Sequence, residues 1–335
     1  MNKRRQRRKH FLLFFFLLLI LFLGLIFSTS YGSVGFLFKN LESAQKEILF
    51  NIRLPRSIMA CLLGGALSLS GFLLQTYFQN PIAGPFILGI SSGSKMTVAL
   101  YTVFFLARGI KSSSLGIIFS SFLGAIVSTF FILIAAKKIK RTAALLLAGI
   151  MSGYISSAIT DFVIATAQDS QIANIHGWSK GSFSGTTWDN CFYALLIIVP
   201  VVFLTFLFSK QIGAYRLGED YAKSMGLRIS FFRIVLILLS STLSATVTAF
   251  AGPISFIGIA APFCAKKIFN TADPFLITPA SFISGAIFCL FCDLLSRILL
   301  APVELNISIV TSFLGSPLVL YILVQKHKKG GNYSG

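Results

Sequence analysis

The segment FLLFFFLLLILFLGLIF (residues 11–27) has no charged side chain and follows a basic run with six Lys and Arg residues between Lys3 and Lys9. Small residues come next, from Ser28 to Ser33, as they do after a secretory signal peptide. The apolar run is longer than the roughly 7–15 residues of a signal-peptide core and close to the about 20 residues that cross a bilayer. We therefore predict a retained membrane helix over residues 11–30, with the basic N-terminus (1–10) in the cytoplasm.

Similar apolar stretches recur to the end of the chain. Of the 335 residues, 55% are hydrophobic and only 12% are charged, about half of the roughly 25% of charged residues typical of a soluble domain. This composition excludes a single soluble fold, a disordered chain and a fibrous one. The sequence therefore predicts an all-α integral membrane protein with about ten transmembrane helices, a single membrane domain over residues 11–325 and a short tail (326–335). The other nine predicted spans are 54–78, 86–106, 115–136, 142–166, 189–208, 229–250, 253–269, 275–298 and 307–324.

The net charge of +19 arises from 29 Lys and Arg residues against 10 Asp and Glu residues. In the ten-helix topology, 19 of the basic residues fall in segments on the side of the N-terminus and seven on the opposite side. An excess of Lys and Arg marks cytoplasmic segments of membrane proteins. The charge therefore predicts that both termini are cytoplasmic, and it requires no nucleic-acid partner.

Motifs for covalent, metal or nucleotide chemistry do not occur. The five cysteines form no CxxC pair, and the chain has no HExxH and no GxxxxGK[ST] sequence. Cysteines within apolar runs behave as small buried hydrophobes. We therefore expect no catalytic site, cofactor or metal in this chain, and any ATP-driven process would need a nucleotide site on a separate subunit.

Acidic residues are scarce inside the predicted helices. Only Asp161 and Asp293 lie there, and both fall toward the outer ends. Ion-coupled carriers usually place such groups near the membrane midplane. Asp293 also lies four residues before Arg297, a spacing that favours a local ion pair on one helix face. An ion-coupled carrier would therefore have few coupling groups.

Small residues recur at four-residue spacing in several predicted helices. This spacing puts both members of a pair on one face, where the helix backbones can approach closely in lipid. The pattern predicts tight helix packing but names no substrate. The pairs are Ala60 and Gly64, Gly89 and Gly93, Gly149 and Gly153, and Ser281 and Gly285.

The longest predicted cytoplasmic loop covers residues 209–228 and contains LGEDYAKSMGL (217–227). Glu219 and Asp220 near the start of this motif, with Lys223 one turn later, predict a short charged helix bounded by glycines. The charge pattern alone leaves two interpretations open. The segment is either a solvated loop helix or a docking element for a peripheral partner.

Six blocks of motif residues occur in order between about residues 53 and 320. Together they resemble the FecCD-type permeases of bacterial ABC importers for iron-siderophore complexes, haem and cobalamin. The blocks are RLPR (53–56) with Gly64, Gly65, Ala66, Gly71 and Gln75; NPIAGP (80–85) with LGISSG (88–93); the LGEDYAKSMG loop (217–226); AGPISFIG (251–258) with Ala261 and Pro262; Asp293 and Arg297 with Glu304 and Leu305; and GSP (315–317).

Three positions depart from the pattern of that family. Phe263 replaces a His, Lys95 stands where a small residue is common, and residues 306–308 (Asn-Ile-Ser) replace a PVG motif. These departures bear on the substrate more than on the fold.

The resemblance implies the architecture of a type II ABC importer permease in the bacterial cytoplasmic membrane. Two such chains, identical or related, would enclose a translocation path. Two cytoplasmic ATP-binding cassette subunits would bind the ATP, and an extracytoplasmic binding protein would deliver the substrate.

The resemblance also assigns roles to particular residues. The loop residues Leu217, Gly218, Glu219, Asp220, Ala222, Lys223 and Gly226 would couple the chain to the ATPase. Arg53, Arg56 and Arg297, which we expect to be exposed at the outer surface, would dock the binding protein. Asn80, Ile82 and Thr142 would form the cytoplasmic gate.

The leading hypothesis is a permease subunit that moves a metal chelate by alternating access, with an iron(III)-siderophore favoured over haem and cobalamin. An ion-coupled secondary transporter that works without an ATPase is the alternative. A membrane scaffold or receptor that transports nothing is a third hypothesis.

Overall fold

The computed structural model describes residues 3–32, 35–36, 43–106, 108, 113–139 and 141–330. This part of the chain is almost entirely helical, and its two short strands, β1 (Tyr31–Gly32) and β2 (Gly35–Phe36), pair antiparallel. The α-helices are α1 (Lys3–Ser30), α2 (Ser43–Ile48), α3 (Leu54–Tyr77), α4 (Ile90–Leu106), α5 (Ser114–Lys138), α6 (Thr142–Ala165), α7 (Asp169–Ser179), α8 (Trp188–Leu207), α9 (Ser209–Arg216), α10 (Glu219–Ser224), α11 (Ile229–Ala251), α12 (Ile257–Phe269), α13 (Pro274–Ile298) and α14 (Ile307–Gly330). A π-helix, η1 (Leu49–Arg53), leads into α3, and a 3₁₀-helix, η2 (Pro85–Leu88), precedes α4.

Eight helical segments among the described residues are long and apolar enough to cross a membrane. They match eight of the ten predicted spans, so the prediction of an all-α membrane fold is confirmed. The eight are α1, the continuous helix Gln45–Tyr77, α5, α6, α8, α11, α13 and α14.

The other two predicted spans, 86–106 and 253–269, each contain a break near the start. Gly89, at φ +70°, separates η2 from the 17-residue α4. Gly252 and Phe256 have φ values of +75° and +65°, so residues 252–256 lie outside the helix and α12 has only 13 residues. A helix of that length is about 20 Å long, which is shorter than the roughly 30 Å hydrocarbon core of a bilayer. The ten-helix count is therefore approximate.

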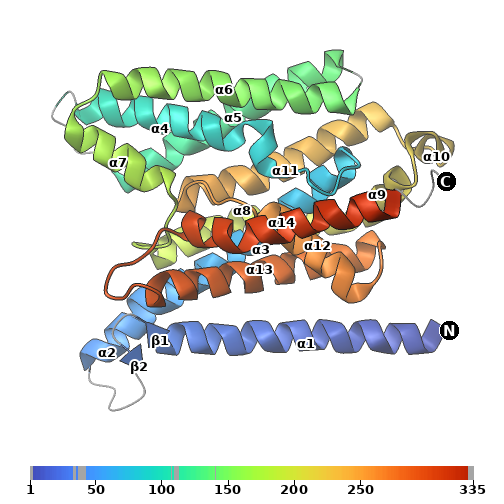
Figure 1. Cartoon of the computed structure of the whole chain (residues 1–335), viewed down its shortest axis with the longest axis horizontal. Coiled ribbons are helices and arrows are strands. Elements are labelled where there is room, and N and C mark those ends of the chain that lie inside the picture. Colours follow the sequence, from blue (N-terminus) through green and yellow to red (C-terminus); the bar gives the residue numbers. More distant parts are fainter. Residues whose placement is uncertain are drawn as a thin grey trace.

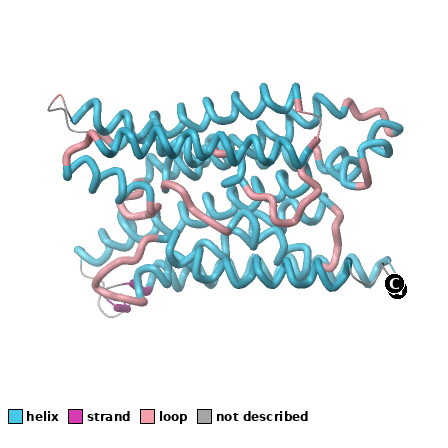
Figure 2. The backbone as a smooth tube through the Cα atoms, turned by 45° about the horizontal axis from the view of Figure 1, so that its top comes forward, coloured by secondary structure: helices cyan, strands magenta, loops and turns pink. Residues whose placement is uncertain are grey.

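The long helices run along one common direction around a central α3 (Figure 1). Helices α4, α5 and α6 lie on one side of the bundle, whereas α1 lies on the opposite side and packs against α13. Figure 2 shows the same arrangement from a second direction.

The two ends of the bundle differ in the elements that they carry (Figure 1). The start of α1 lies at one end together with α9, α10 and the end of α14. We call this the basic end, because it carries Arg4–Lys9, Lys137, Lys138, Lys210, Lys266 and Lys267. The opposite end carries α2, α7 and the β1–β2 pair, and we call it the hairpin end.

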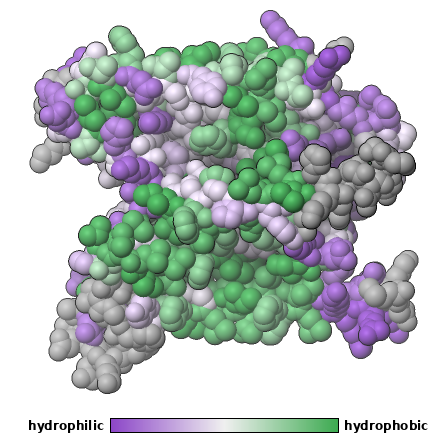
Figure 3. Space-filling view, in the orientation of Figure 1, coloured by the Kyte–Doolittle hydropathy of each residue, from purple (hydrophilic) through white to green (hydrophobic). Residues whose placement is uncertain are grey.

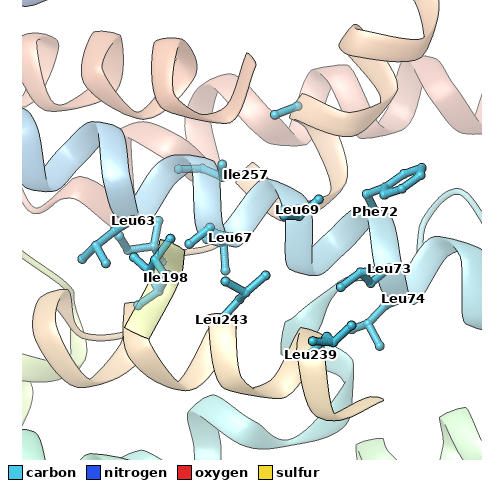
Figure 4. Close-up of a cluster of buried hydrophobic side chains, with 14 of the residues drawn as sticks. Leu63, Leu67, Leu69, Phe72, Leu73, Leu74, Ile198, Leu239, Leu243 and Ile257 are labelled. Atoms are coloured by element: carbon cyan, nitrogen blue, oxygen red, sulfur yellow. The ribbon is translucent and has the colours of Figure 1, made fainter. Parts of the chain in front are cut away.

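Helix α3 forms the centre of the core. Its buried leucines face Leu239 and Leu243 of α11, Ile198 of α8 and Ile257 of α12 (Figure 4). Lipid tails are as apolar as leucine, so these contacts stabilise the fold through close packing rather than through removal from water. Apolar side chains cover much of the outer surface between the two polar ends, as Figure 3 shows, which is the pattern expected of a lipid-facing protein.

Glycines allow α3 to approach its neighbours closely. A Cβ atom built on Gly64 would lie 2.6 Å from the carbonyl oxygen of Gly285 in α13, and one built on Gly71 would lie 1.7 Å from that of Gly258 in α12. Neither position has room for a side chain. The close packing predicted for Gly64 and Gly285 is confirmed.

We expect Gly71→Ala to lower the free energy of unfolding by at least the 1–3 kcal/mol of a typical overpacked core. The new methyl group would meet a backbone atom, which cannot move aside as a flexible side chain can. The measurement is the thermal midpoint of the purified protein in detergent. Gly177→Ala is the matched control, because a Cβ at Gly177 meets nothing within 4 Å. Equal midpoints for the two variants would contradict the packing described for α3.

Candidate coupling and docking sites

A buried ionic network lies at the hairpin end, where α3 meets α13. The Arg56 Nε donates to Asp293 Oδ1 at 3.0 Å, and its Nη1 donates to both carboxylate oxygens of Glu304, at 2.9 and 3.0 Å. Asp293 is fully buried, whereas the Glu304 side chain is 38% exposed. Arg56 therefore joins α13 to the segment that follows it.

The other two arginines hold the end of α1. Arg297 lies 3.1 Å from Asp293 Oδ2 and donates to the hydroxyl and the carbonyl oxygen of Ser28, at 2.6 and 3.1 Å. Arg53 donates to the carbonyl oxygen of Ser30 at 3.1 Å. Since Ser28 also shares a hydrogen bond with Ser57 of α3, the network ties α1, α3 and α13 together.

These contacts correct one expectation and confirm another. Arg53, Arg56 and Arg297 are 6%, 8% and 3% exposed, so the prediction that they are exposed is wrong. The local pair between Asp293 and Arg297 is confirmed. Sequence reasoning missed Glu304 as a partner of Arg56, because a separation of 248 residues gives no spacing signal. The docking role of the three arginines stays a prediction.

The loop predicted to couple to a partner forms two short helices at the basic end, α9 and α10. Gly218 and Gly226 adopt φ values of +121° and +81° on either side of α10, a conformation that favours glycine. Ala222 is fully buried, so it anchors α10 instead of contacting a partner. The charged helix bounded by glycines is therefore present as predicted.

Glu219 fastens α10 to the membrane helices. Its carboxylate forms an ion pair with Arg233 of α11 and accepts a hydrogen bond from the Tyr215 hydroxyl at 3.2 Å. Burial raises the pKa of Tyr215, which keeps its hydroxyl protonated as a donor. A force on α10 can therefore reach α11 directly.

The outer surface of this loop is partly apolar. Leu217, Tyr221 and Met225 are between 48% and 71% exposed, and they recur at four-residue spacing. Asp220 and Lys223, which form a solvent-exposed pair at 3.2 Å, lie beside them. Exposed aromatic and Met side chains are typical of binding surfaces. Sequence reasoning selected Leu217 but missed Tyr221 and Met225, although their spacing was visible.

The three predicted gate residues lie in two elements. Asn80 and Ile82 form the turn between α3 and η2, where the Asn80 side-chain oxygen accepts from the Ile82 N–H at 3.4 Å. Thr142 is the first residue of α6. In the described part of the chain no hydrogen bond joins Thr142 to that turn, although η2 packs closely on α6 through Gly149. The gating role stays a prediction.

The other acid predicted within a membrane helix is Asp161. Asp161 is exposed on α6. No group of three or more His, Cys, Asp or Glu side chains in the described residues could hold a metal ion.

A bundle of long apolar helices with a structured loop exposed at one end defines a multi-span membrane protein. The model of the FecCD transport family matches residues 12–325. The chain therefore belongs to the FecCD transport family and is a membrane permease of the ABC importer type.

Two curated relatives are vitamin B12 import system permease proteins named BtuC. The protein from Klebsiella pneumoniae subsp. pneumoniae is 31% identical over 291 residues, covering 87% of this chain and 86% of its own. The protein from Salmonella newport is 32% identical, with coverages of 84% and 86%.

Two solved structures are similar. An inward-facing conformation of a metal-chelate type ABC transporter has a TM-score of 0.84 at 26% sequence identity, and the match covers 93% of this chain and 98% of that one. PsaBC from Streptococcus pneumoniae, in complex with a Fab, shares the fold alone, with a TM-score of 0.52 at 16% identity and coverages of 80% and 88%.

Proposed function

We propose that this chain is the membrane-spanning subunit of an ATP-driven importer that brings a metal chelate into a bacterial cell. The observation that carries this proposal is the match, over almost the whole of both chains, to a metal-chelate type ABC transporter. The surroundings of the two predicted membrane acids disfavour the alternative, an ion-coupled carrier, because Asp161 is exposed and Asp293 is paired with two arginines.

The charge distribution supports an orientation with the basic end, and both termini, in the cytoplasm. In this orientation the exposed face of α10 meets an ATP-binding cassette subunit, and the Glu219–Arg233 pair transmits its movement to α11. The hairpin end then faces the substrate-binding protein. Two copies of the chain, or one copy with a related permease, enclose a path that opens alternately to the two sides, with Asn80, Ile82 and Thr142 at the cytoplasmic gate.

Two cargoes are proposed, both bulky metal chelates. An iron(III)-siderophore is the first candidate, and cobalamin is the second because the relatives named above import vitamin B12. Uptake of ⁵⁵Fe-siderophore and of ⁵⁷Co-cobalamin distinguishes them, in cells that lack their own importers and express this chain with its ATPase and binding protein. We expect one label to accumulate. If neither label nor labelled haem accumulates, the metal-chelate proposal is wrong.

We propose that Arg56 docks the binding protein by exchanging partners. Glu304 is the exposed member of its network, so an acidic side chain of the binding protein can take the place of Glu304 on Arg56. We expect Glu304→Gln to tighten binding about two- to fivefold, the effect of an exposed ion pair of up to about 1 kcal/mol. Titration of the permease in nanodiscs with the binding protein at low salt measures this. Glu47→Gln, an exposed change at the same end, is the control. Unchanged or weaker binding with Glu304→Gln would refute partner exchange.

A further inference from the structure

A groove opens at the basic end, where the start of α1 separates from α13. Its volume is about 770 Å³. The wall from α1 consists of Gln6, Arg7, His10, Phe11 and Phe14, and the opposite wall consists of Phe206, Thr271, Asp273, Phe275, Leu276 and Pro279.

Both walls change from polar to apolar in the same direction. On α1, Arg7, His10, Phe11 and Phe14 follow one another at spacings of three, one and three residues, which puts them on one helix face. Arg7 is nearest the basic end, and Phe14 lies about 10 Å further along the helix. Across the groove, Asp273 precedes Phe275, Leu276 and Pro279 in the same order. The groove therefore has a polar mouth and an apolar interior.

The mouth has a net positive charge. Arg7 has no ion-pair partner among the described residues, and Arg4, Arg5, Arg8 and Lys9 flank it. The one carboxylate at the mouth is Asp273, whose side chain already accepts the Phe275 N–H at 3.1 Å as the cap of α13. A ligand in this groove would therefore present a negative group to Arg7 and His10 and an apolar chain to the phenylalanines.

The interior lies on the lipid-facing surface of the bundle. Phe11 and Phe275 are exposed, and the groove runs along α1, where Figure 3 shows polar side chains at the N-terminal end giving way to apolar ones. Basic pockets between membrane helices suit the head groups of anionic lipids. We propose that this groove binds an anionic phospholipid, with its phosphate at Arg7 and His10 and an acyl chain between Phe14 and Leu276.

Such a lipid would complete the attachment of α1. At the hairpin end the Arg297 and Arg53 contacts hold this helix, whereas at the basic end it leaves the groove open. The inference does not depend on the cargo or on the ATPase.

Native mass spectrometry of the delipidated full-length protein, titrated with phosphatidylglycerol or phosphatidylcholine, tests the proposal. The wild type should bind phosphatidylglycerol more tightly. Losing a charge-assisted contact to phosphate should weaken that binding about tenfold in Arg7→Gln/His10→Gln, and it should weaken phosphatidylcholine binding less, because the choline cation offsets the phosphate charge of that lipid. Arg8→Gln, which removes a charge from the same run but does not line the groove, is the control.

A second variant tests the acyl chain. Leu276→Trp fills the interior and keeps Arg7, so binding of both lipids should fall. Equal binding of the two lipids by the wild type would overturn the proposal. An equal loss in Arg8→Gln and in the double variant would overturn it as well, because attraction would then come from the basic run as a whole.

Discussion

We expect Asp293→Ala to lower the free energy of unfolding by about 3–5 kcal/mol, the cost of removing one partner from a buried ion pair. The variant leaves Arg56 and Arg297 buried, with Glu304 as the remaining carboxylate of the network. Because Arg297 also holds Ser28, the end of α1 should loosen in the same variant. Denaturant titration of the protein in mixed micelles measures the loss.

The matched control for this prediction is Asp161→Ala. It removes another carboxylate of a membrane helix, but from an exposed position, so its effect should stay within about 0.5 kcal/mol. If Asp293→Ala is no more destabilising than this control, the network does not stabilise the hairpin end.

The second large effect concerns the exposed face of α10. We expect Tyr221→Ala/Met225→Ala to weaken binding of the ATPase subunit about 30-fold or more, because truncating a single interface hot spot costs about 2 kcal/mol. Both side chains are exposed, so the permease itself should unfold at an unchanged temperature. Titration of the permease in nanodiscs with the purified ATPase gives the affinity.

Met151→Ala controls for the loss of an exposed methionine, because Met151 is exposed on α6, away from the coupling loop in sequence. This variant should bind the ATPase like the wild type. Equal affinities for all three proteins would show that α10 is not the coupling surface.

Most of the fold can be predicted from the length of the apolar runs in the sequence. Eight predicted spans are found as long helices because each needs only an uninterrupted apolar run. The start of α12 could not be predicted in this way. Residues 252–256 contain the pair Gly252-Pro253, a turn signal that a measure of apolar length does not register, and the break in the structure has positive φ values at Gly252 and Phe256.

The sites were harder to predict than the spans. The glycines at both ends of α10 are required by the local backbone conformation of the turns, so the sequence was enough to predict this loop. The burial of Arg56 depends on residues far away in the sequence, because its partners are Asp293 on α13 and Glu304 after it. The sequence alone does not distinguish an arginine that is free to bind a partner protein from one that is already paired with a carboxylate of the same chain.

The groove beside α1 illustrates the same difference. The helical spacing of Arg7, His10, Phe11 and Phe14 is visible in the sequence, but these residues do not stand out from the basic and apolar runs around them. Only the divergence of α1 from α13 shows that this face borders a cavity.

ATP-driven import is tested most directly in proteoliposomes that contain the permease and its ATPase, with the loaded binding protein added on the side of the hairpin end. We predict uptake of the labelled chelate that requires ATP at the basic end, persists when ionophores dissipate all ion gradients and is lost in Tyr221→Ala/Met225→Ala. Uptake by the permease alone that stops when the gradients are dissipated would show an ion-coupled carrier instead.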